Sequence, residues 1–184
     1  MIEVEKKFRP TEEQLQALLK DSQFMKEVVN DDIVYDYPDY RLISNSIRFR
    51  RRSGKFELKI GRGLDGYSAE EIENEEDIKK YFNISSSLED FIKDNLIEGM
   101  HIVTKRKKYK KDDFSIDIDE LDFGYKCVEI ELMVSSESEA DEAHRRILQL
   151  AKEYNFDTSP VPAKKKEYFR KVKPEVFKQL YPNG

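Results

Sequence analysis

Apolar and charged residues alternate along several short segments of the chain. At the start of the chain, Glu3, Glu5 and Lys7 are separated by apolar or long side chains, with Val4 as the first apolar spacer. Side chains at every second position share one face of a strand, so this alternation predicts strands with one charged and one apolar face. The segments that predict strands are 2–8, 47–50, 56–59, 69–73, 101–107, 115–119, 125–134 and 163–169.

Segments between these strands favour helices and turns. Thr11 followed three residues later by Gln14 is a capping-box pattern, which predicts a helix that begins after Thr11. The other predicted helices are 77–82, 86–96, 138–154 and a short one that opens at Pro174. A turn is predicted at 35–39, and a loop at Gly61, Gly63 and Gly66. Many antiparallel strands with a few helices between them predict an α+β fold, in which a closed or nearly closed sheet carries its helices outside.

Length and composition exclude several classes of protein. The 184 residues predict a single domain spanning 1–184. The 33 basic and 38 acidic residues leave a net charge of −5, so we do not expect nucleic acid as a partner. The single cysteine, Cys127, excludes an internal disulfide, and no apolar stretch reaches membrane-spanning length. We therefore expect a cytoplasmic monomer with no membrane partner. Two histidines do not suffice for a typical zinc site, so any metal would be a hard ion bound by oxygen.

The charges of the predicted strands are sorted by sign. The pairs of like charge are Glu3 and Glu5, Arg48 and Arg50, Asp117 and Asp119, and Glu129 and Glu131. An antiparallel sheet with one wet face also alternates, but such faces usually mix polar residue types. Like charges two residues apart repel each other, so persistent pairs indicate external counter-ions. A metal cation would neutralise the acidic strands, and a polyanion would neutralise the basic ones.

If the sheet closes with its charged face inward, its interior suits a chain of phosphates. Carboxylates would then bind Mg²⁺ or Mn²⁺, and Arg and Lys side chains would bind phosphate oxygens. Phosphoryl transfer needs this combination, because its catalysis consists mainly of positioning and charge neutralisation.

A set of motifs in this order resembles the CYTH superfamily, the triphosphate tunnel metalloenzymes. The motifs are Glu3-Val4-Glu5-Lys6-Lys7, Arg48-Phe49-Arg50, Phe56-Glu57-Leu58-Lys59, Val103-Thr104-Lys105-Arg106, Asp117-Ile118-Asp119, Asp122-Phe123-Gly124-Tyr125, Glu129-Ile130-Glu131 and Pro162-Ala163-Lys164. They cover most of the chain. The Thr-Lys-Arg, Asp-Phe-Gly-Tyr and Pro-Ala-Lys pieces look most like the thiamine triphosphatase branch.

This resemblance implies a closed, eight-stranded antiparallel tunnel that hydrolyses triphosphates with a divalent metal, Mg²⁺ or Mn²⁺. By position, the triphosphate would be bound by Lys7, Arg48, Arg50, Lys59, Arg106 and Lys164. The main metal ligands would be Glu5, Asp119, Glu129 and Glu131, and the acidic side would be completed by Glu3, Glu71 and Asp117. The implied catalytic residues are Glu3, Lys59 and Tyr35, the last two as a dyad. Water activation stays open between a carboxylate and a second metal ion.

The substrate stays open between thiamine triphosphate and inorganic tripolyphosphate. Mammalian-type thiamine triphosphatases place a Trp just before the Arg-x-Arg strand, whereas this chain has Ser46 there and no Trp. The alternatives are an RNA 5′-triphosphatase, a class IV-like adenylate cyclase, and a polyphosphate-binding module without turnover. The intact set of carboxylates counts against the last of these.

Overall fold

The computed structural model describes residues 1–62 and 68–182 and places eight strands there. They are β1 (Ile2–Phe8), β2 (Gln23–Asp36), β3 (Ile47–Arg52), β4 (Lys55–Arg62), β5 (Ser68–Ile72), β6 (Ile97–Lys111), β7 (Phe114–Leu121) and β8 (Lys126–Val134). The helices of the same residues are α1 (Glu12–Lys20), α2 (Arg41–Ser44), α3 (Glu75–Phe82), α4 (Leu88–Asn95), η1 (Glu137–Glu139), α5 (Ala140–Glu153), α6 (Lys164–Val172) and α7 (Pro174–Leu180). The fold is thus α+β.

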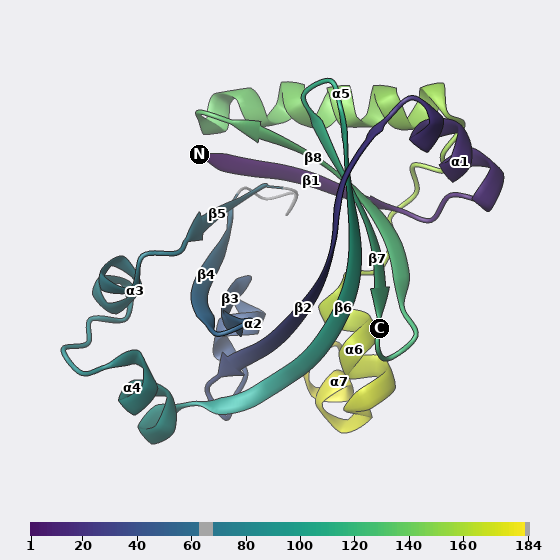
Figure 1. Cartoon of the computed structure of the whole chain (residues 1–184). Coiled ribbons are helices and arrows are strands. Elements are labelled where there is room, and N and C mark those ends of the chain that lie inside the picture. Colours follow the sequence, from purple (N-terminus) through teal and green to yellow (C-terminus); the bar gives the residue numbers. More distant parts are fainter. Residues whose placement is uncertain (63–67, 183–184) are drawn as a thin grey trace.

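The eight strands form a closed ring in which neighbours run antiparallel (Figure 1). Their order is β1-β5-β4-β3-β2-β6-β7-β8, and β8 pairs back to β1. The register of these pairs places charged residues opposite one another. Across β1 and β8, Glu5 lies opposite Glu131 and Lys7 lies opposite Glu129. The closure of the sheet therefore concentrates charge on its inner face.

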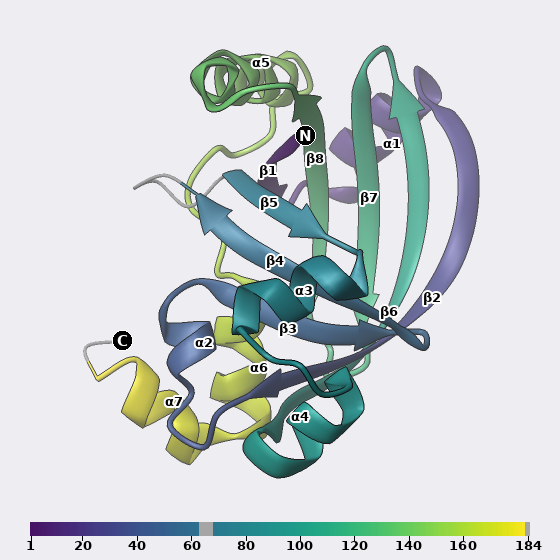
Figure 2. The same ribbon diagram turned by 90° about the vertical axis from the view of Figure 1, so that its left-hand side faces the viewer.

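The helices cover the outside of the ring and bury its apolar face. α5 packs across β1 and β8, where Val4, Ile130 and Ile147 are fully buried in one core. α6 and α7 lie at the opposite end of the ring from α5 (Figures 1 and 2). Another core, beneath α3 and α4, contains Phe49 and Leu58. Because apolar residues point outward to these helices, the alternating charged residues must point inward.

Local signals near the N-terminus act as the sequence predicts. The capping box of α1 is confirmed, since the Gln14 amide donates to Thr11 Oγ1 and the Thr11 amide donates to Gln14 Oε1 at 2.8 Å. Of the predicted glycine loop, Gly61 belongs to β4, and Gly63 and Gly66 lie outside the described residues. No helix in the described part of the chain has the length and apolar character needed to span a bilayer.

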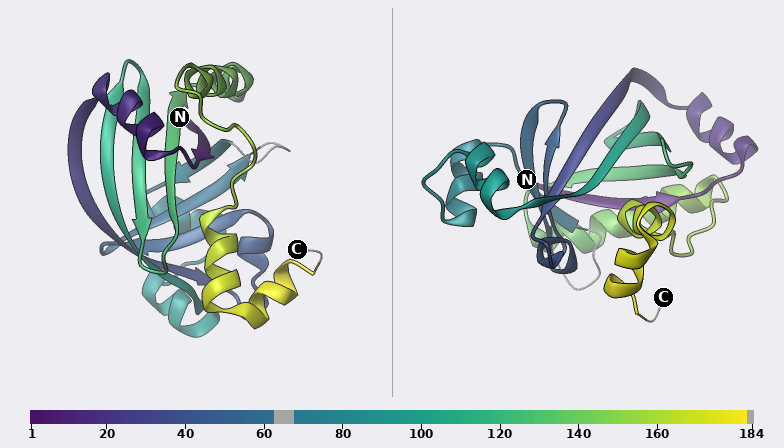
Figure 3. Two further views of the ribbon diagram at one scale, coloured as in Figure 1. Left: turned by 90° about the vertical axis from the view of Figure 1, so that its right-hand side faces the viewer. Right: turned by 90° about the horizontal axis from the view of Figure 1, so that it is seen from below.

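Two element predictions are wrong. The segment 163–169 forms helix α6 instead of a strand, because its run of Lys and Glu favours helix and lacks strand alternation. The strand that the sequence pattern misses is β2, which ends at Asp36 inside the predicted turn 35–39. A register shift between Phe24 and Lys26 interrupts its alternation, and half of the strand is exposed. Figure 3 shows α6 and α7 from two further sides of the ring.

Candidate active site

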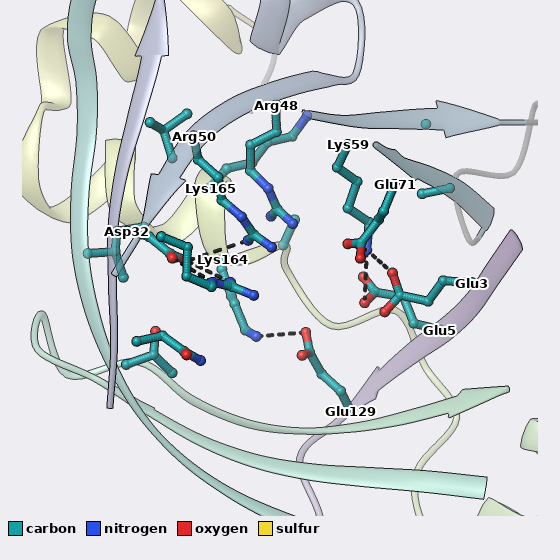
Figure 4. A pocket seen from close by; sticks show the side chains of 18 of the residues that line it. Glu3, Glu5, Asp32, Arg48, Arg50, Lys59, Glu71, Glu129, Lys164 and Lys165 are labelled. Carbon is teal, nitrogen blue, oxygen red and sulfur yellow. Dashed lines mark hydrogen bonds and ion pairs between the residues drawn. The ribbon is translucent and has the colours of Figure 1, made fainter. Parts of the chain in front are cut away.

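The inner face of the ring lines a cavity of about 410 Å³. Each of the eight strands contributes at least one lining residue, and the rest come from α2, from α6 and from Ser46 and Ala163 beside these helices. The predicted site residues that line the cavity are Glu3, Glu5, Lys7, Arg48, Arg50, Lys59, Glu71, Arg106, Glu129, Glu131 and Lys164. In Figure 4, Glu3, Glu5 and Glu71 lie together beside Lys59, and Arg48, Arg50, Lys164 and Lys165 point into the neighbouring space.

Arg106 is surrounded by three carboxylates. Its guanidinium donates to both oxygens of Asp119 at 2.7 and 2.6 Å, and it also pairs with Asp117 at 2.5 Å and with Glu129 at 2.7 Å. Asp117 and Asp119 are fully buried, and neither of them lines the cavity directly. Lys164 reaches from α6 to Asp119 and Glu129. These two cations therefore pair with three of the four inward-facing carboxylates of β7 and β8.

A second acidic group lies on β1. Lys59 pairs with Glu3, and it lies 3.3 Å from Glu71. Burial raises the pKa of Glu3 despite the opposing charge of Lys59. Burial acts in the same direction on Glu5, but the 2.5 Å contact with Lys7 outweighs it and lowers the pKa of Glu5 to about 2. Glu5 is thus ionised at neutral pH and can serve as a metal ligand.

Glu131 connects the two acidic groups and has no cationic partner in the described part of the chain. Its carboxylate oxygens come within 4.8 Å of ligand atoms of Glu3 and Glu5 on one side, and of Asp117 and Glu129 on the other. No Lys or Arg of the described residues forms an ion pair with it. Burial, together with the negative charges of neighbouring carboxylates, raises the pKa of Glu131 to about 9. This is the environment expected of a carboxylate that shares a cation.

The donors around Glu131 fit a hard divalent metal ion. Glu131 and the four residues around it all offer carboxylates, the ligand type that Mg²⁺, Mn²⁺ and Ca²⁺ prefer. Within the described residues, the Oδ1 atom of Asp117 is buried and has no hydrogen-bond donor, so it is a free acceptor on a carboxylate of this group. A third group, Asp119, Cys127 and Glu129, is also close enough to hold an ion, but Arg106 and Lys164 already neutralise its two carboxylates.

The metal-free protein should lose stability as pH rises from about 5 to about 9. The folded state holds a proton on Glu131 up to a pKa of about 9, whereas the unfolded chain releases it near 4.5, so raising the pH favours the unfolded state across this interval. Mg²⁺ competes with that proton, so its stabilising effect should be larger at pH 9 than at pH 6. Melting curves in EDTA and in Mg²⁺ at both pH values test this. If the melting temperature of Glu131→Gln depended on pH in the same way as that of the wild type, Glu131 would not be the group responsible.

Arg48 and Arg50 provide the basic side of the cavity on β3. Arg50 donates to Glu57 at 2.7 Å and lies 3.4 Å from Asp32. Burial and the neighbouring charges of Arg48 and Arg52 lower the pKa of Arg50 to about 10. Arg48 differs, because among the described residues it has no carboxylate partner and its buried Nε atom has no acceptor. Its charge is available to an external anion.

The predicted Tyr35–Lys59 dyad is not formed. Tyr35 lies opposite Phe49 on the outer face of the ring, where the two ring centroids are 5.9 Å apart. Lys59 points into the cavity. Side chains at successive positions of a strand take opposite faces, and the neighbouring Val34 lines the cavity together with Asn30 and Asp32 of the same strand. Tyr35 is therefore a packing residue in the core beneath α4.

The motifs did not identify several charged residues of the cavity. Arg52 extends the Arg48–Arg50 alternation by one step, and Lys108 does the same for Arg106, so continued alternation was the available signal. Asp32, which forms two 2.7 Å hydrogen bonds with Arg52, was missed together with β2. Lys165 follows the Pro-Ala-Lys motif directly, and only the helical geometry of α6 reveals that it also lines the cavity.

The family model described as the CYTH domain matches residues 1–160. The chain belongs to the CYTH domain family. The match contains all of the carboxylates around Glu131 and all of the Arg residues on β3. Lys164 lies just beyond it. No sequence among curated proteins is significantly similar to this CYTH chain.

Solved structures share the fold of this CYTH domain. The PH1819 protein of Pyrococcus horikoshii has a TM-score of 0.65 and 22% identity, over 95% of this chain and 99% of its own. A candidate adenylate cyclase from Vibrio parahaemolyticus has a TM-score of 0.64 and 18% identity, over 90% and 97% of the two chains. HpAC1, a candidate adenylyl cyclase from Hippeastrum with a dominant triphosphatase activity, has a TM-score of 0.57 and 17% identity, over 92% and 94%. At these identities the likeness shows the fold alone.

Proposed function

We propose that this CYTH protein is a single domain that hydrolyses the terminal phosphate of a triphosphate, with Mg²⁺ as its metal ion. One observation carries the proposal. One cavity contains a cluster of carboxylates around Glu131, which itself forms no ion pair with a described residue, and a basic side on which Arg48 has no carboxylate partner among the described residues. A metal ion would neutralise the carboxylates, and the phosphate chain bound to it would pair with Arg48.

The metal would be held by carboxylates from three strands. Besides Glu131, the carboxylates whose oxygen atoms lie close enough are Glu3, Glu5, Asp117 and Glu129. We assign Asp119 and Glu71 to the same acidic side of the cavity. A divalent ion at this place neutralises charge on the phosphate oxygens and makes bound water more acidic. We assign binding of the substrate phosphates to Arg48 and Arg50. The other cations of the cavity form ion pairs with the carboxylates and neutralise their charge; they are Lys7, Lys59, Arg106 and Lys164.

We assign activation of the attacking water to Glu3. Burial raises its pKa, so it can accept a proton more readily than an exposed carboxylate can. Lys59 contacts Glu3 directly and thereby orients it. Tyr35 has no part in this step, because it lies outside the ring.

The two substrate candidates are thiamine triphosphate and inorganic tripolyphosphate. The Thr104-Lys105-Arg106 and Asp122-Phe123-Gly124-Tyr125 motifs support the thiamine triphosphatase branch. Ser46 lines the cavity where mammalian-type relatives have a Trp, so a stacking partner for thiamine is missing from this position. Both candidates share the triphosphate that Arg48 and Arg50 would bind.

A substrate panel tests the proposal and chooses between these candidates. The purified protein with Mg²⁺ is offered thiamine triphosphate, tripolyphosphate, ATP and RNA with a 5′-triphosphate, and orthophosphate and pyrophosphate are measured separately. Release of orthophosphate, fastest from one of the first two, is the expected result. Pyrophosphate with cyclic AMP from ATP would instead indicate a cyclase, and no product from any of the four would refute the hydrolase.

Arg48→Gln should weaken substrate binding without weakening the fold. Charge-assisted hydrogen bonds to phosphate contribute roughly 1.5–3 kcal/mol, so kcat/KM should fall about 10- to 100-fold. The melting temperature should stay near the wild-type value, because Arg48 has no carboxylate partner among the described residues. The matched control is Arg51→Gln on the same strand, which does not line the cavity. Equal losses in both variants would contradict the assignment.

A further inference from the structure

Lys165 is a second cation that α6 contributes to the cavity, and it lies outside the family motifs. Its Nζ atom donates to the backbone carbonyl of Ile43 at 3.3 Å. No Asp or Glu of the described residues lies within ion-pair distance of it. Burial and the positive charge of Arg48 lower the pKa of Lys165, and the negative charge of the buried Asp36 acts in the opposite direction. Lys165 and Arg48 line the same cavity (Figure 4). Two cations therefore share one end of the cavity, and neither forms an ion pair with a described side chain.

The adjacent Lys164 is in a different situation. It contacts both Asp119 and Glu129, so its charge is already balanced within the protein. Successive residues of a helix are rotated by about 100° from each other, which turns Lys165 away from these carboxylates and toward β3 and α2. The two neighbouring lysines thus serve different sides of the cavity.

The fold holds Lys165 in place through α2. Asp36 is fully buried and accepts hydrogen bonds from the amides of Tyr37, Leu42 and Ile43 at 2.7, 2.9 and 2.9 Å. These bonds fix the short helix whose Ile43 carbonyl accepts from Lys165. The first turn of α6 has no side-chain cap, so the partial positive charge of its amides adds to the same end of the cavity.

We propose that Lys165 binds a phosphate group of the substrate together with Arg48, at the end of the cavity between α2, α6 and β3. The ligand is a phosphate of a triphosphate or longer polyphosphate, so the inference rests on the proposed function and adds a binding residue to it. An anion between the two cations replaces their repulsion with two charge-assisted contacts. Without it, Lys165 and Arg48 face each other at a cost in stability, as is common for residues placed for binding.

The test compares Lys165→Gln with Lys165→Arg and with the control Lys166→Gln. Lys166 lies over the ring of Tyr181 on the outside of α6 and does not line the cavity. The affinity for tripolyphosphate is measured by calorimetry in EDTA. The melting temperature is measured with and without tripolyphosphate, and kcat and KM are measured in the presence of Mg²⁺. Lys165→Gln should bind tripolyphosphate about 10- to 100-fold more weakly, and its kinetic defect should appear mostly as a higher KM. Lys165→Arg should stay within a few-fold of wild type.

The melting temperatures separate a binding role from a structural one. If Lys165 binds phosphate, Lys165→Gln should melt at or above the wild-type temperature when no ligand is present, and should lose most of the stabilisation by tripolyphosphate. A lower melting temperature with unchanged affinity would overturn the proposal. Wild-type affinity in Lys165→Gln would overturn it while leaving the hydrolase intact. Loss of affinity in a protein that hydrolyses nothing would support Lys165 and refute the hydrolase.

Discussion

Arg106→Met should destabilise the protein by about 3–5 kcal/mol, the cost typical of removing one partner from a buried ion pair. Arg106 contacts Asp117, Asp119 and Glu129 at 2.5 to 2.7 Å, and the two aspartates are fully buried. Methionine fills a similar volume but leaves these carboxylates with less compensating charge. Urea unfolding at pH 7 in EDTA measures the effect. Lys108→Met is the control, because Lys108 pairs with just one carboxylate of the described residues, Asp117 at 3.0 Å, and is more exposed.

The difference between wild type and Arg106→Met should shrink at low pH. Although burial opposes it, the charges of Lys164, Lys7 and Arg106 hold the pKa of Glu129 well below its usual value. A carboxylate with a lowered pKa contributes stability above its unfolded pKa, and that stability disappears as the pH falls through the folded value. The wild type should therefore lose more stability than the variant on acidification. A difference that stays constant down to pH 3 would show that Arg106 acts through packing rather than charge.

Glu131→Gln should abolish metal-dependent turnover, with a loss in kcat/KM on the order of 10³-fold, more than the loss usual for mutating a residue that only supports a ligand. Among the described residues, Glu131 is the carboxylate shared by the groups on β1 and on β7–β8. The amide keeps the shape of the protonated acid but cannot bind a cation through a charged oxygen. The fold should remain intact, because the raised pKa of Glu131 means that the metal-free protein already tolerates a neutral group there.

Two measurements make the Glu131→Gln result specific. Mg²⁺ titrations followed by melting temperature should show weaker metal binding, and Glu120→Gln should behave as wild type, because Glu120 is exposed on the outer face and pairs with Lys126. Turnover that survives in Glu131→Gln with wild-type metal dependence would place the metal elsewhere in the cavity.

Strand alternation predicted most of the ring because it reflects a simple physical requirement. A closed sheet with helices outside needs apolar residues on one face of each strand, and β1, β3, β4, β7 and β8 meet this requirement with little interruption. The same alternation predicted that Arg48, Glu5 and Glu131 share a face, as the cavity shows. The capping box of α1 was readable for a similar reason, since it depends on residues only three positions apart.

The features that the sequence did not reveal depend on contacts between distant segments. β2 is held by its long pairing with β6, not by its own pattern, and Tyr35 faces outward because of the register of that strand. The different situations of Lys164 and Lys165 depend on the direction in which α6 leaves the ring. Nor could spacing show that Arg106 is balanced by three carboxylates whereas Arg48 has no partner among the described residues.

The most direct measurement is orthophosphate release from tripolyphosphate and thiamine triphosphate by the purified protein, as Mg²⁺ is removed with EDTA and then restored. We predict release of one phosphate per turnover from at least one of the two, loss of the activity in EDTA, and its full return with Mg²⁺. Activity that persists unchanged in EDTA, or no release from either triphosphate at any Mg²⁺ concentration, would contradict a metal-dependent triphosphatase built around Glu131 and Arg48.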